Sequence, residues 1–405
     1  MPSQLPVGKA AAPDGRLPAS ALAALAGQNF GVYVHVPFCA TRCGYCDFNT
    51  YTAPELGDGG SRVAYTDSVL AELRLARRVL SEAEPPVSTV FFGGGTPTLL
   101  AAAELGRILA GIGSEFGLAP AAEVTTEANP ESVDPAYLDE LRRHGFNRIS
   151  FGMQSARPHV LAVLDRRHTP GRPEQCVAWA RAAGFAQVSL DLIYGTPGES
   201  LADWRESVEV AVAAGPDHVS AYALVVEEGT RLARQVARGE LVRPDDDDMA
   251  DKYLLADELL GAAGYRWYEV SNWARAGAAC RHNLGYWRGE NWWGIGPGAH
   301  SFVGGTRWWN VKHPAAYAAR LAGGGSPALA SEVLTDADRR LERVLLGLRL
   351  AEGLPVAELT EVGRKAADSA TAEGLLEPAP YAEGLAVLTS RGRLLADAVV
   401  RELVD

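Results

Sequence analysis

The sequence lacks any run of 18 consecutive apolar residues, so no segment has the pattern of a membrane-spanning helix. Cysteine is scarce: an odd count of five in 405 residues argues against a disulfide framework and favours a reducing, cytoplasmic compartment. Positive charge is also in deficit, with 38 Lys and Arg against 50 Asp and Glu and a formal net charge of −12. Because nucleic-acid binding needs a basic surface, we expect no nucleic-acid partner.

The remaining composition is typical of a globular protein, with 47% hydrophobic and 22% charged residues. A chain of 405 residues is long enough for about two or three domains. The first 30 residues are rich in Ala and Pro, and Lys9, Asp14 and Arg16 interrupt any apolar run. We therefore expect residues 1–30 to form a flexible leader rather than a secretory signal.

From residue 31 onward, β-branched and aromatic runs alternate with helical patterns. Six runs are almost continuously apolar or β-branched, as in strands of a buried parallel sheet: 31–37, 87–92, 123–128, 147–153, 187–194 and 218–224. Helical patterns lie between them at 64–79, 102–116, 134–144, 174–183 and 200–214. This alternation predicts an α/β fold, a partial (β/α)6 barrel over residues 31–265; a doubly wound open sheet is the alternative.

The composition changes beyond about residue 265. Seven of the nine tryptophans lie between Trp267 and Trp309, which predicts an aromatic-rich segment over residues 266–330. Residues 331–405 contain an amphipathic helix near 336–350, then a short hairpin and a last helix. They predict a small α+β C-terminal domain resembling a winged helix, although its acidity does not favour DNA binding. The run 245–248 (DDDD) is expected to cap a helix rather than bind a metal.

Thiols, glycines and carboxylates follow the strand candidates, at the end where a parallel barrel carries its active site. In chain order these residues are Cys39, Cys43 and Cys46; Gly93, Gly94, Gly95 and Thr96; Glu127; Gln154; Asp191; and Ala223. Because the carboxyl ends of parallel strands share one edge, we expect these groups to converge on one face.

The Cys-x3-Cys-x2-Cys loop is the strongest of these signals. Three thiolates on one loop can hold zinc or an iron–sulfur cluster. A structural zinc takes four protein ligands, and the nearest fourth candidate, His35, lies within the first strand. A [4Fe–4S] cluster normally takes four cysteines, so three would leave one iron open to a chelating ligand. We favour that open-iron cluster and keep the structural zinc loop as the alternative.

The GGGTP loop at 93–97 and the strand-end acids are weaker signals. The loop lacks both the GxGxxG spacing and the lysine of a P-loop, so it is either a ligand cradle or a tight turn. Its glycines would allow the backbone to approach the carboxylate or amino end of a ligand closely. Glu127 and Asp191, if buried, need amine or hydroxyl partners, although each has an ordinary alternative as a helix cap or core ion pair.

Together, the motifs YVHVPF with CxxxCxxC, then GGGTP and EANP, resemble the radical S-adenosylmethionine (SAM) superfamily over most of residues 31–230. They are most similar to the branch containing oxygen-independent coproporphyrinogen III dehydrogenase and the haem chaperones. The resemblance implies that Cys39, Cys43 and Cys46 bind a [4Fe–4S] cluster, and that SAM chelates its fourth iron. It also implies contacts with SAM: Tyr33 and Tyr45 beside the nucleoside and cluster, Gly94, Gly95 and Thr96 at the methionine end with Glu127 nearby, Gln154, Arg166 and Asp191 at the ribose and carboxylate, and Ala223 at the adenine.

The chemistry that the resemblance implies is reductive. An electron, from a donor such as a flavodoxin or ferredoxin, enters the cluster, the sulfonium C–S bond breaks, and a 5′-deoxyadenosyl radical forms. Two departures put decarboxylation of coproporphyrinogen in doubt. Phe48 stands where the dehydrogenase has a further cysteine, and only the leader precedes Tyr33, where the dehydrogenase has a longer segment. The haem chaperones share both departures.

A second motif, His282 to Trp287, matches the HNxxYW pattern that is implicated in haem binding in those chaperones. The resemblance implies a haem site at His282, Asn283, Tyr286 and Trp287, with Cys280 and His300 as competing ligands. A neutral imidazole suits haem iron, and aromatic rings suit the macrocycle. The alternative is an aromatic second core with His282 hydrogen-bonded inside it. Residues 294–301 also resemble the family and are expected to close over the cofactor mouth.

The implied function is that of a haem chaperone, which binds haem and transfers it to an acceptor haemoprotein of respiration. An oxygen-independent coproporphyrinogen III oxidase is the enzyme alternative, and an RNA-modifying radical SAM enzyme is a third, disfavoured by the net charge of −12. Whether this chain cleaves SAM is left open. The resemblance further suggests a homodimer, in the cytoplasm or peripheral to the membrane through its partners.

Overall fold

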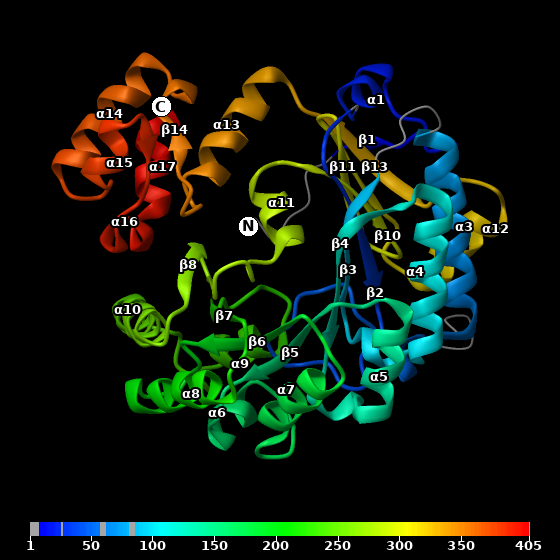
Figure 1. Cartoon of the computed structure of the whole chain (residues 1–405), viewed down its shortest axis with the longest axis horizontal. Helices are drawn as coiled ribbons and strands as arrows, with labels where there is room; N and C mark the ends of the chain where they lie inside the picture. Colours follow the sequence, from blue (N-terminus) through cyan, green and yellow to red (C-terminus); the bar gives the residue numbers. More distant parts are fainter. Residues whose placement is uncertain (1–7, 26, 57–61, 81–85, 405) are drawn as a thin grey trace.

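The structure, a computed structural model, describes residues 8–25, 27–56, 62–80 and 86–404. Six parallel strands in sequential order form its centre: β2 (Phe30–Val36), β3 (Val87–Gly94), β4 (Leu118–Ala128), β5 (Arg148–Gln154), β6 (Gln187–Tyr194) and β7 (His218–Ala223). The main helices between them are α3 (Arg62–Leu80), α4 (Ala102–Phe116), α5 (Pro135–His144), α7 (Arg172–Ala182) and α8 (Leu201–Ala214). The predicted partial (β/α)6 barrel is confirmed (Figure 1).

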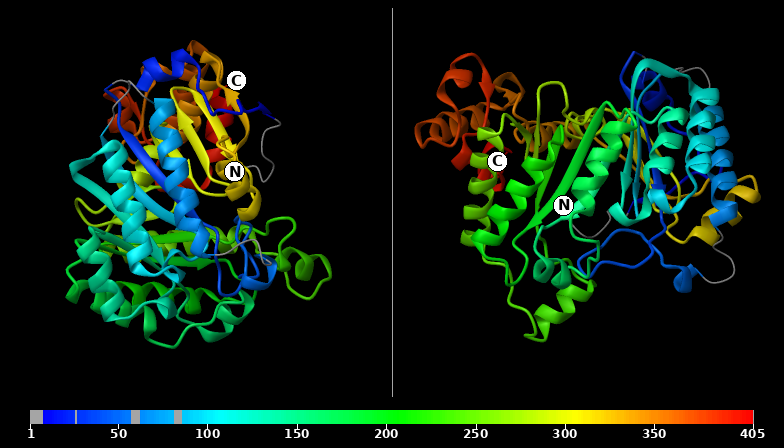
Figure 2. Two further views of the ribbon diagram at one scale, coloured as in Figure 1. Left: turned by 90° about the vertical axis from the view of Figure 1, so that its right-hand side faces the viewer. Right: turned by 60° about the horizontal axis from the view of Figure 1, so that its bottom comes forward.

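Alternation along the strands separates an outer face from an inner face. On β2, Val32, Val34 and Val36 are fully buried in the core, whose other side is formed by the helices. Figures 1 and 2 show α3, α4 and α5 along the outer side of the sheet. The intervening residues, including Tyr33 and His35, line the concave inner wall. The inner wall therefore carries the side chains that are free to serve a site.

The aromatic-rich segment continues the barrel sheet at both of its edges. Its strands are β8 (Arg266–Glu269), β9 (Asn272–Ala274), β10 (Asn291–Ile295), β11 (His300–Val303), β12 (Thr306–Asn310) and β13 (Ala328–Val333). β9 pairs antiparallel with β7, and β10 pairs parallel with β2. The order of the sheet is β1-β13-β12-β11-β10-β2-β3-β4-β5-β6-β7-β9-β8. This arrangement covers the edges that β2 and β7 would otherwise leave unpaired.

The described part of the leader has regular structure, in contrast to the flexible leader that we expected. β1 (Lys9–Ala10) pairs antiparallel with β13, and α1 (Ala19–Leu25) contacts β11. Ala21 and Leu25 of α1 are fully buried. The Ala-rich composition concealed a short helix, because its stability comes from packing on a sheet formed far along the chain.

The C-terminal region has a separate hydrophobic core and forms the expected small α+β unit. Its elements are α13 (Asp336–Gly347), β14 (Leu354–Pro355), α14 (Glu361–Ala372), α15 (Pro378–Ala382), β15 (Leu385–Ala386), α16 (Ser390–Leu394) and α17 (Ala396–Val404). It contacts the barrel through Arg393, which bonds Asp257 of α10 (Asp246–Ala262) at 2.6 Å and lies 4.5 Å from the Trp267 ring. Asp245 caps α10 as expected. No helix of the described residues is long and apolar enough to cross a membrane.

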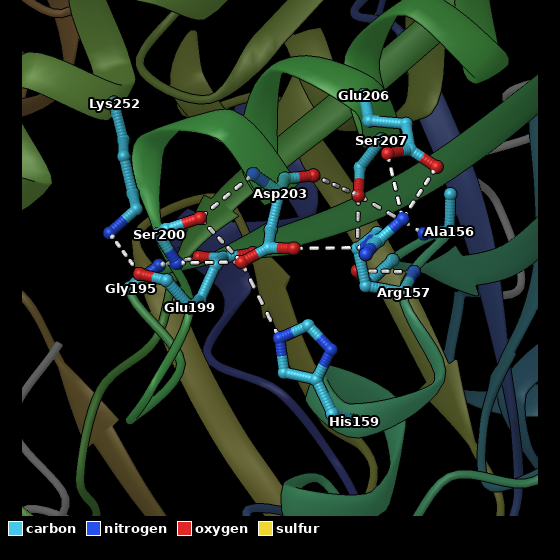
Figure 3. A network of polar contacts seen from close by, with 11 residues as sticks. Ala156, Arg157, His159, Gly195, Glu199, Ser200, Asp203, Glu206, Ser207 and Lys252 are labelled. Atoms are coloured by element: carbon cyan, nitrogen blue, oxygen red, sulfur yellow. Dashed lines mark hydrogen bonds and ion pairs between the residues drawn. The ribbon is translucent and has the colours of Figure 1, made fainter.

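The loop that follows β5 is fastened to α8 by a polar network, which Figure 3 shows. Arg157, just before α6 (Pro158–Val163), pairs with Asp203 at 2.9 Å and with Glu206 at 2.8 Å. The Ala156 amide donates to the Ser207 hydroxyl at 3.0 Å. Because Gln154 directly precedes this loop and Arg166 follows α6, the network fixes two residues of the expected cofactor site.

Candidate cofactor site

The cysteine loop follows β2 and is held by backbone hydrogen bonds to three other segments. The Cys39 amide donates to Tyr51, the Gly44 amide to Leu164, and the Leu232 amide to Gly44. The three thiols of the loop are free and partly exposed. Partial burial raises the pKa of Cys39, and that of Cys46 to about 11, so a metal must displace thiol protons when it binds.

Among the described residues, no three His, Cys, Asp or Glu side chains are arranged to hold a single metal ion. The thiols nevertheless act on one another electrostatically, since Cys43 and Cys39 both contribute to the raised pKa of Cys46, after burial. The loop thus offers three neighbouring soft donors and no fourth, which suits the donor set of an iron–sulfur cluster with one open iron.

The GGGTP loop packs directly against the cysteine loop. A Cβ on Gly95 would lie 2.5 Å from the Phe38 carbonyl oxygen, and one on Gly94, whose φ is +105°, would lie 2.6 Å from the His35 ring. The Gly95 and Thr96 amides donate to Val36 and Phe38, and the Gly94 amide donates to Glu127. The glycines are needed for contact between the two loops. Their amides already have acceptors, so they cannot also bind a ligand's carboxylate in this conformation.

Glu127 and Asp191 project from β4 and β6 into the barrel. Asp191 accepts hydrogen bonds from the hydroxyls of Ser150 and Ser220, at 2.8 and 2.7 Å, which are the hydroxyl partners that the sequence predicted. Burial, and then the nearby Asp191, raise the pKa of Glu127 to about 8. Glu127 is therefore largely protonated at neutral pH, and a cation placed beside it would favour its ionised form.

Arg166 connects the cysteine loop to the end of β5. Its Nη1 donates to the Cys43 sulfur at 3.6 Å and its Nη2 to the Gly152 carbonyl at 3.1 Å. Its buried Nε has no hydrogen-bond partner among the residues that the structure describes. Gln154 has a left-handed φ of 64°, and a Cβ on Gly152 would lie 2.7 Å from its amide nitrogen. A strained residue and an unpartnered donor beside three free thiols are features of a site made for a ligand.

The other three expected SAM contacts lie at different places around the barrel. Tyr45 packs on a small cluster that includes Leu164 and Leu232, beneath the cysteine loop. Ala223 ends β7 in register with Tyr194. Tyr33 lies on the inner wall: its hydroxyl bonds His35 Nδ1 at 3.0 Å and its ring stacks with His282 at 6.5 Å. Tyr33 therefore connects the cofactor end of the barrel to the HNxxYW motif.

The HNxxYW motif forms α11 (Arg281–Trp287), and His282 lies inside the barrel, only 4% exposed. Its Nδ1 bonds the Thr89 hydroxyl and its Nε2 bonds the Tyr286 hydroxyl, both at 2.8 Å. Burial lowers the pKa of His282 to about 3, so the ring is neutral. Both ring nitrogens are engaged, as in the alternative of a histidine hydrogen-bonded within a core. As arranged here, His282 offers no free nitrogen to haem iron.

The residues around His282 hold α11 against the inner wall. Glu123 accepts hydrogen bonds from the Arg281 and His282 amides, both at 3.0 Å. Asn283 donates to Glu269 at 2.9 Å, and the Tyr286 ring meets the edge of Trp292 at 4.7 Å between centroids. These contacts tie the start of the helix to β4 and its remaining length to β8 and β10.

The two competing haem ligands are poorly placed for that role. Cys280 is 3% exposed, and burial raises its pKa to about 12, which keeps the thiol protonated. His300 begins β11, where its ring stacks on Trp309 at 5.9 Å rather than on α11. Just before it, the Pro297 carbonyl accepts from Asn49 at 3.0 Å, so the loop around 294–301 supports the cysteine loop.

A second buried histidine, which no sequence motif marks, has the same pattern of contacts. His218 of β7 bonds the Ser189 hydroxyl through Nδ1 at 2.7 Å and the Tyr268 hydroxyl through Nε2 at 2.8 Å. Arg148, at the start of β5, is also buried in this region. The available signal was a charged or imidazole side chain within an otherwise apolar strand, where only the inner wall can accommodate it.

Comparisons with known proteins show the family and the fold. Residues 33–211 match the Radical SAM superfamily. The chain is 56% identical to the haem chaperone HemW of Mycobacterium tuberculosis (strain H37Rv), over 95% of this chain and 97% of that protein. It is 32% identical to HemW of Bacillus subtilis (strain 168), over 91% and 97%. The solved structure of coproporphyrinogen III oxidase (HemN) from Escherichia coli superposes with a TM-score of 0.81, covering 96% of this chain and 94% of that chain at 22% identity, a likeness of fold.

Proposed function

Since this chain belongs to the radical SAM superfamily and, within it, to the family of the HemW haem chaperones, we propose that it binds haem and delivers it to acceptor haemoproteins. The observation that carries the proposal is the identity of 56% over 95% of the chain, a span that includes the cysteine loop and α11. Phe48 supports the same conclusion, because the haem chaperones share this departure from the further cysteine of the dehydrogenase.

Cys39, Cys43 and Cys46 would hold the [4Fe–4S] cluster, and Arg166, Gln154, Glu127 and Asp191 would surround SAM. When bound, the cluster supplies a reducing electron to the sulfonium of SAM. The residues of the chain would bind SAM and orient it. The buried Nε donor of Arg166 suits a carboxylate, and Glu127 suits a cationic group. The stacked rings of Tyr33, Phe91 and His282 lie on the inner wall of the barrel. They would exclude water from that side of the site.

The raised pKa of Glu127 predicts that SAM binds more tightly as the pH rises. Below pH 8 the Glu127 carboxyl is mostly protonated, so a cation that binds beside it must first displace the proton. Above pH 8 the carboxyl is already ionised, and binding no longer requires this deprotonation. We expect the affinity to increase from pH 6 to pH 8, by at most about tenfold per pH unit, and then to level off. Calorimetric titration of the anaerobically reconstituted chain measures this. Glu127→Gln is the control, and an unchanged slope in that variant would assign the effect to SAM itself.

We propose that the Tyr286 hydroxyl masks the haem-binding nitrogen of His282. Iron and the hydroxyl compete for Nε2, while the Thr89 hydroxyl bonds Nδ1 and fixes the ring. Asn283 would anchor the helix through Glu269, and Tyr286 and Trp287 would supply aromatic surface once the hydroxyl has moved. Release of Tyr286 would therefore convert a core histidine into a ligand.

Removing the masking hydroxyl tests this mechanism. We expect Tyr286→Phe to raise the haem affinity about five- to tenfold, because one hydrogen bond no longer competes with iron. Absorbance titration with haem measures the affinity. Tyr137→Phe, which removes a hydroxyl that donates to the Leu100 carbonyl on the outer side of the barrel, is the control and should leave the affinity unchanged. Equal affinities of wild type and His282→Ala would show that His282 is only a core residue.

The partners follow from the same proposal. The ligand is haem, the acceptor is a haemoprotein, which we propose is respiratory, and the electron donor is a flavodoxin or ferredoxin. We further propose a cytoplasmic protein that reaches the membrane through its partners and forms a homodimer. Mixing the haem-loaded chain with an apo-haemoprotein tests the central claim. Haem should appear in the acceptor, whereas vinyl product from coproporphyrinogen would instead indicate the oxidase.

A further inference from the structure

Arg148 is a buried charge whose side chain has no hydrogen-bond partner among the described residues. It is 2% exposed, and its Nε and Nη2 are both buried with no hydrogen-bond partner. Within the described residues its guanidinium forms no ion pair either. Burial of a guanidinium without a hydrogen-bonded partner destabilises the folded state, because the group loses its hydration and gains no hydrogen bond that replaces it. Such a group in a folded protein calls for an explanation.

The two unfilled nitrogens are the pair that recognises a carboxylate. The N–H bonds of Nε and Nη2 lie on the same side of the planar guanidinium and point in parallel. A carboxylate accepts both with its two oxygens, the bidentate arrangement that gives Arg–carboxylate pairs their strength and geometric specificity. A neutral hydroxyl or thiol fills at most one of them.

The nearby acids do not fill this position because they are engaged elsewhere. The groups that act electrostatically on Arg148 are Cys280, Glu123, Tyr268 and Asp191. Glu123 accepts the two amides at the start of α11, and Asp191 accepts two serine hydroxyls. Burial raises the pKa of both Cys280 and Tyr268, so these two groups are neutral.

We propose that Arg148 binds a carboxylate of the transported ligand, namely a propionate group of a haem-type tetrapyrrole. The proposal rests on the proposed haem-binding function and adds the anchor for the acidic side of the ligand. The location of Arg148 supports the proposal. Tyr268 and Cys280, which act electrostatically on Arg148, lie on the segment that carries the HNxxYW motif, and Cys280 immediately precedes α11. The guanidinium would bind a propionate, and α11 would contact the tetrapyrrole ring and its iron.

The test compares haem with its dimethyl ester, in which both propionates are neutral, by absorbance titration of the full chain. We expect wild type to prefer haem over the ester by about tenfold or more, the range for a hydrogen bond to a charged group. In Arg148→Met the preference should fall to about one- to threefold. Arg148→Lys keeps the charge but lacks the two parallel N–H donors, so its preference for haem should lie between those of wild type and Arg148→Met.

The matched control is Arg142→Met, which removes an arginine that lies over Phe185 outside the inner wall and should leave the preference unchanged. If the preference persists in both Arg148 variants, or is absent from wild type, Arg148 does not bind a propionate and the inference is overturned. If wild type binds neither haem nor the ester, the proposed function itself fails. A wild-type ratio near one overturns the inference without any variant, and Arg148→Lys, which keeps the buried charge, carries the comparison if Arg148→Met does not fold.

Discussion

Replacing Cys39, Cys43 or Cys46 by alanine should abolish cluster binding, from about four iron atoms per chain to nearly none. The reason is the donor set: the loop supplies three neighbouring thiols and no fourth, so the loss of one leaves two, too few to retain the cluster. Iron and acid-labile sulfide analysis after anaerobic reconstitution measures the effect. SAM binding should be lost with the iron, because its chelation site disappears.

The two remaining cysteines provide the control. Cys176 of α7 is fully buried and donates to the Pro130 carbonyl, and Cys280 lies beside Glu123. Alanine at either position should leave the iron content unchanged. A wild-type preparation that is colourless and contains stoichiometric zinc would contradict the cluster and restore the structural zinc loop.

Gly294→Ala should destabilise the chain by about 3 kcal/mol. A Cβ at this position would lie 1.9 Å from the His300 carbonyl oxygen, a backbone atom that cannot move without separating β10 from β11. β10 also pairs with β2, so the displacement would reach the strand that carries the cysteine loop. The midpoint of thermal unfolding should fall accordingly.

Gly261→Ala is the counterpart of this substitution. Gly261 lies in α10 with no outside atom within 4 Å of its added Cβ. Alanine there should stabilise the chain by about 0.5–1 kcal/mol, since it restricts the unfolded backbone and favours the helix. A Gly294→Ala variant as stable as wild type would show that β10 and β11 are not packed as described.

Local sequence patterns were sufficient for the barrel. The strand 187–194 and the helix 102–116 have the predicted bounds, because a buried parallel strand is continuously apolar and an outer helix has a regular apolar face. The cysteine loop was equally visible, since its three thiols are neighbours in sequence. Hydroxyl partners for Asp191 were also predictable, from the rule that a buried acid needs a donor.

Contacts between distant segments were beyond the sequence. His282 bonds Thr89, 193 residues earlier, and no periodicity connects them. The motif alone suggested a free ligand, whereas the fold engages both ring nitrogens. The strands of the aromatic segment were not predictable for a similar reason: they are only 3–6 residues long and pair with both edges of the barrel. Arg148 was missed because a single arginine at a strand start carries no motif.

The position of β2 in the middle of the sheet has a consequence for synthesis on the ribosome. This strand is complete at residue 36, whereas β10, its neighbour on one side, is complete only at residue 295. Throughout that interval the nascent barrel exposes an unpaired strand edge, the kind of surface on which chains associate wrongly. The thiol loop follows that same strand, so its final support forms only late in translation.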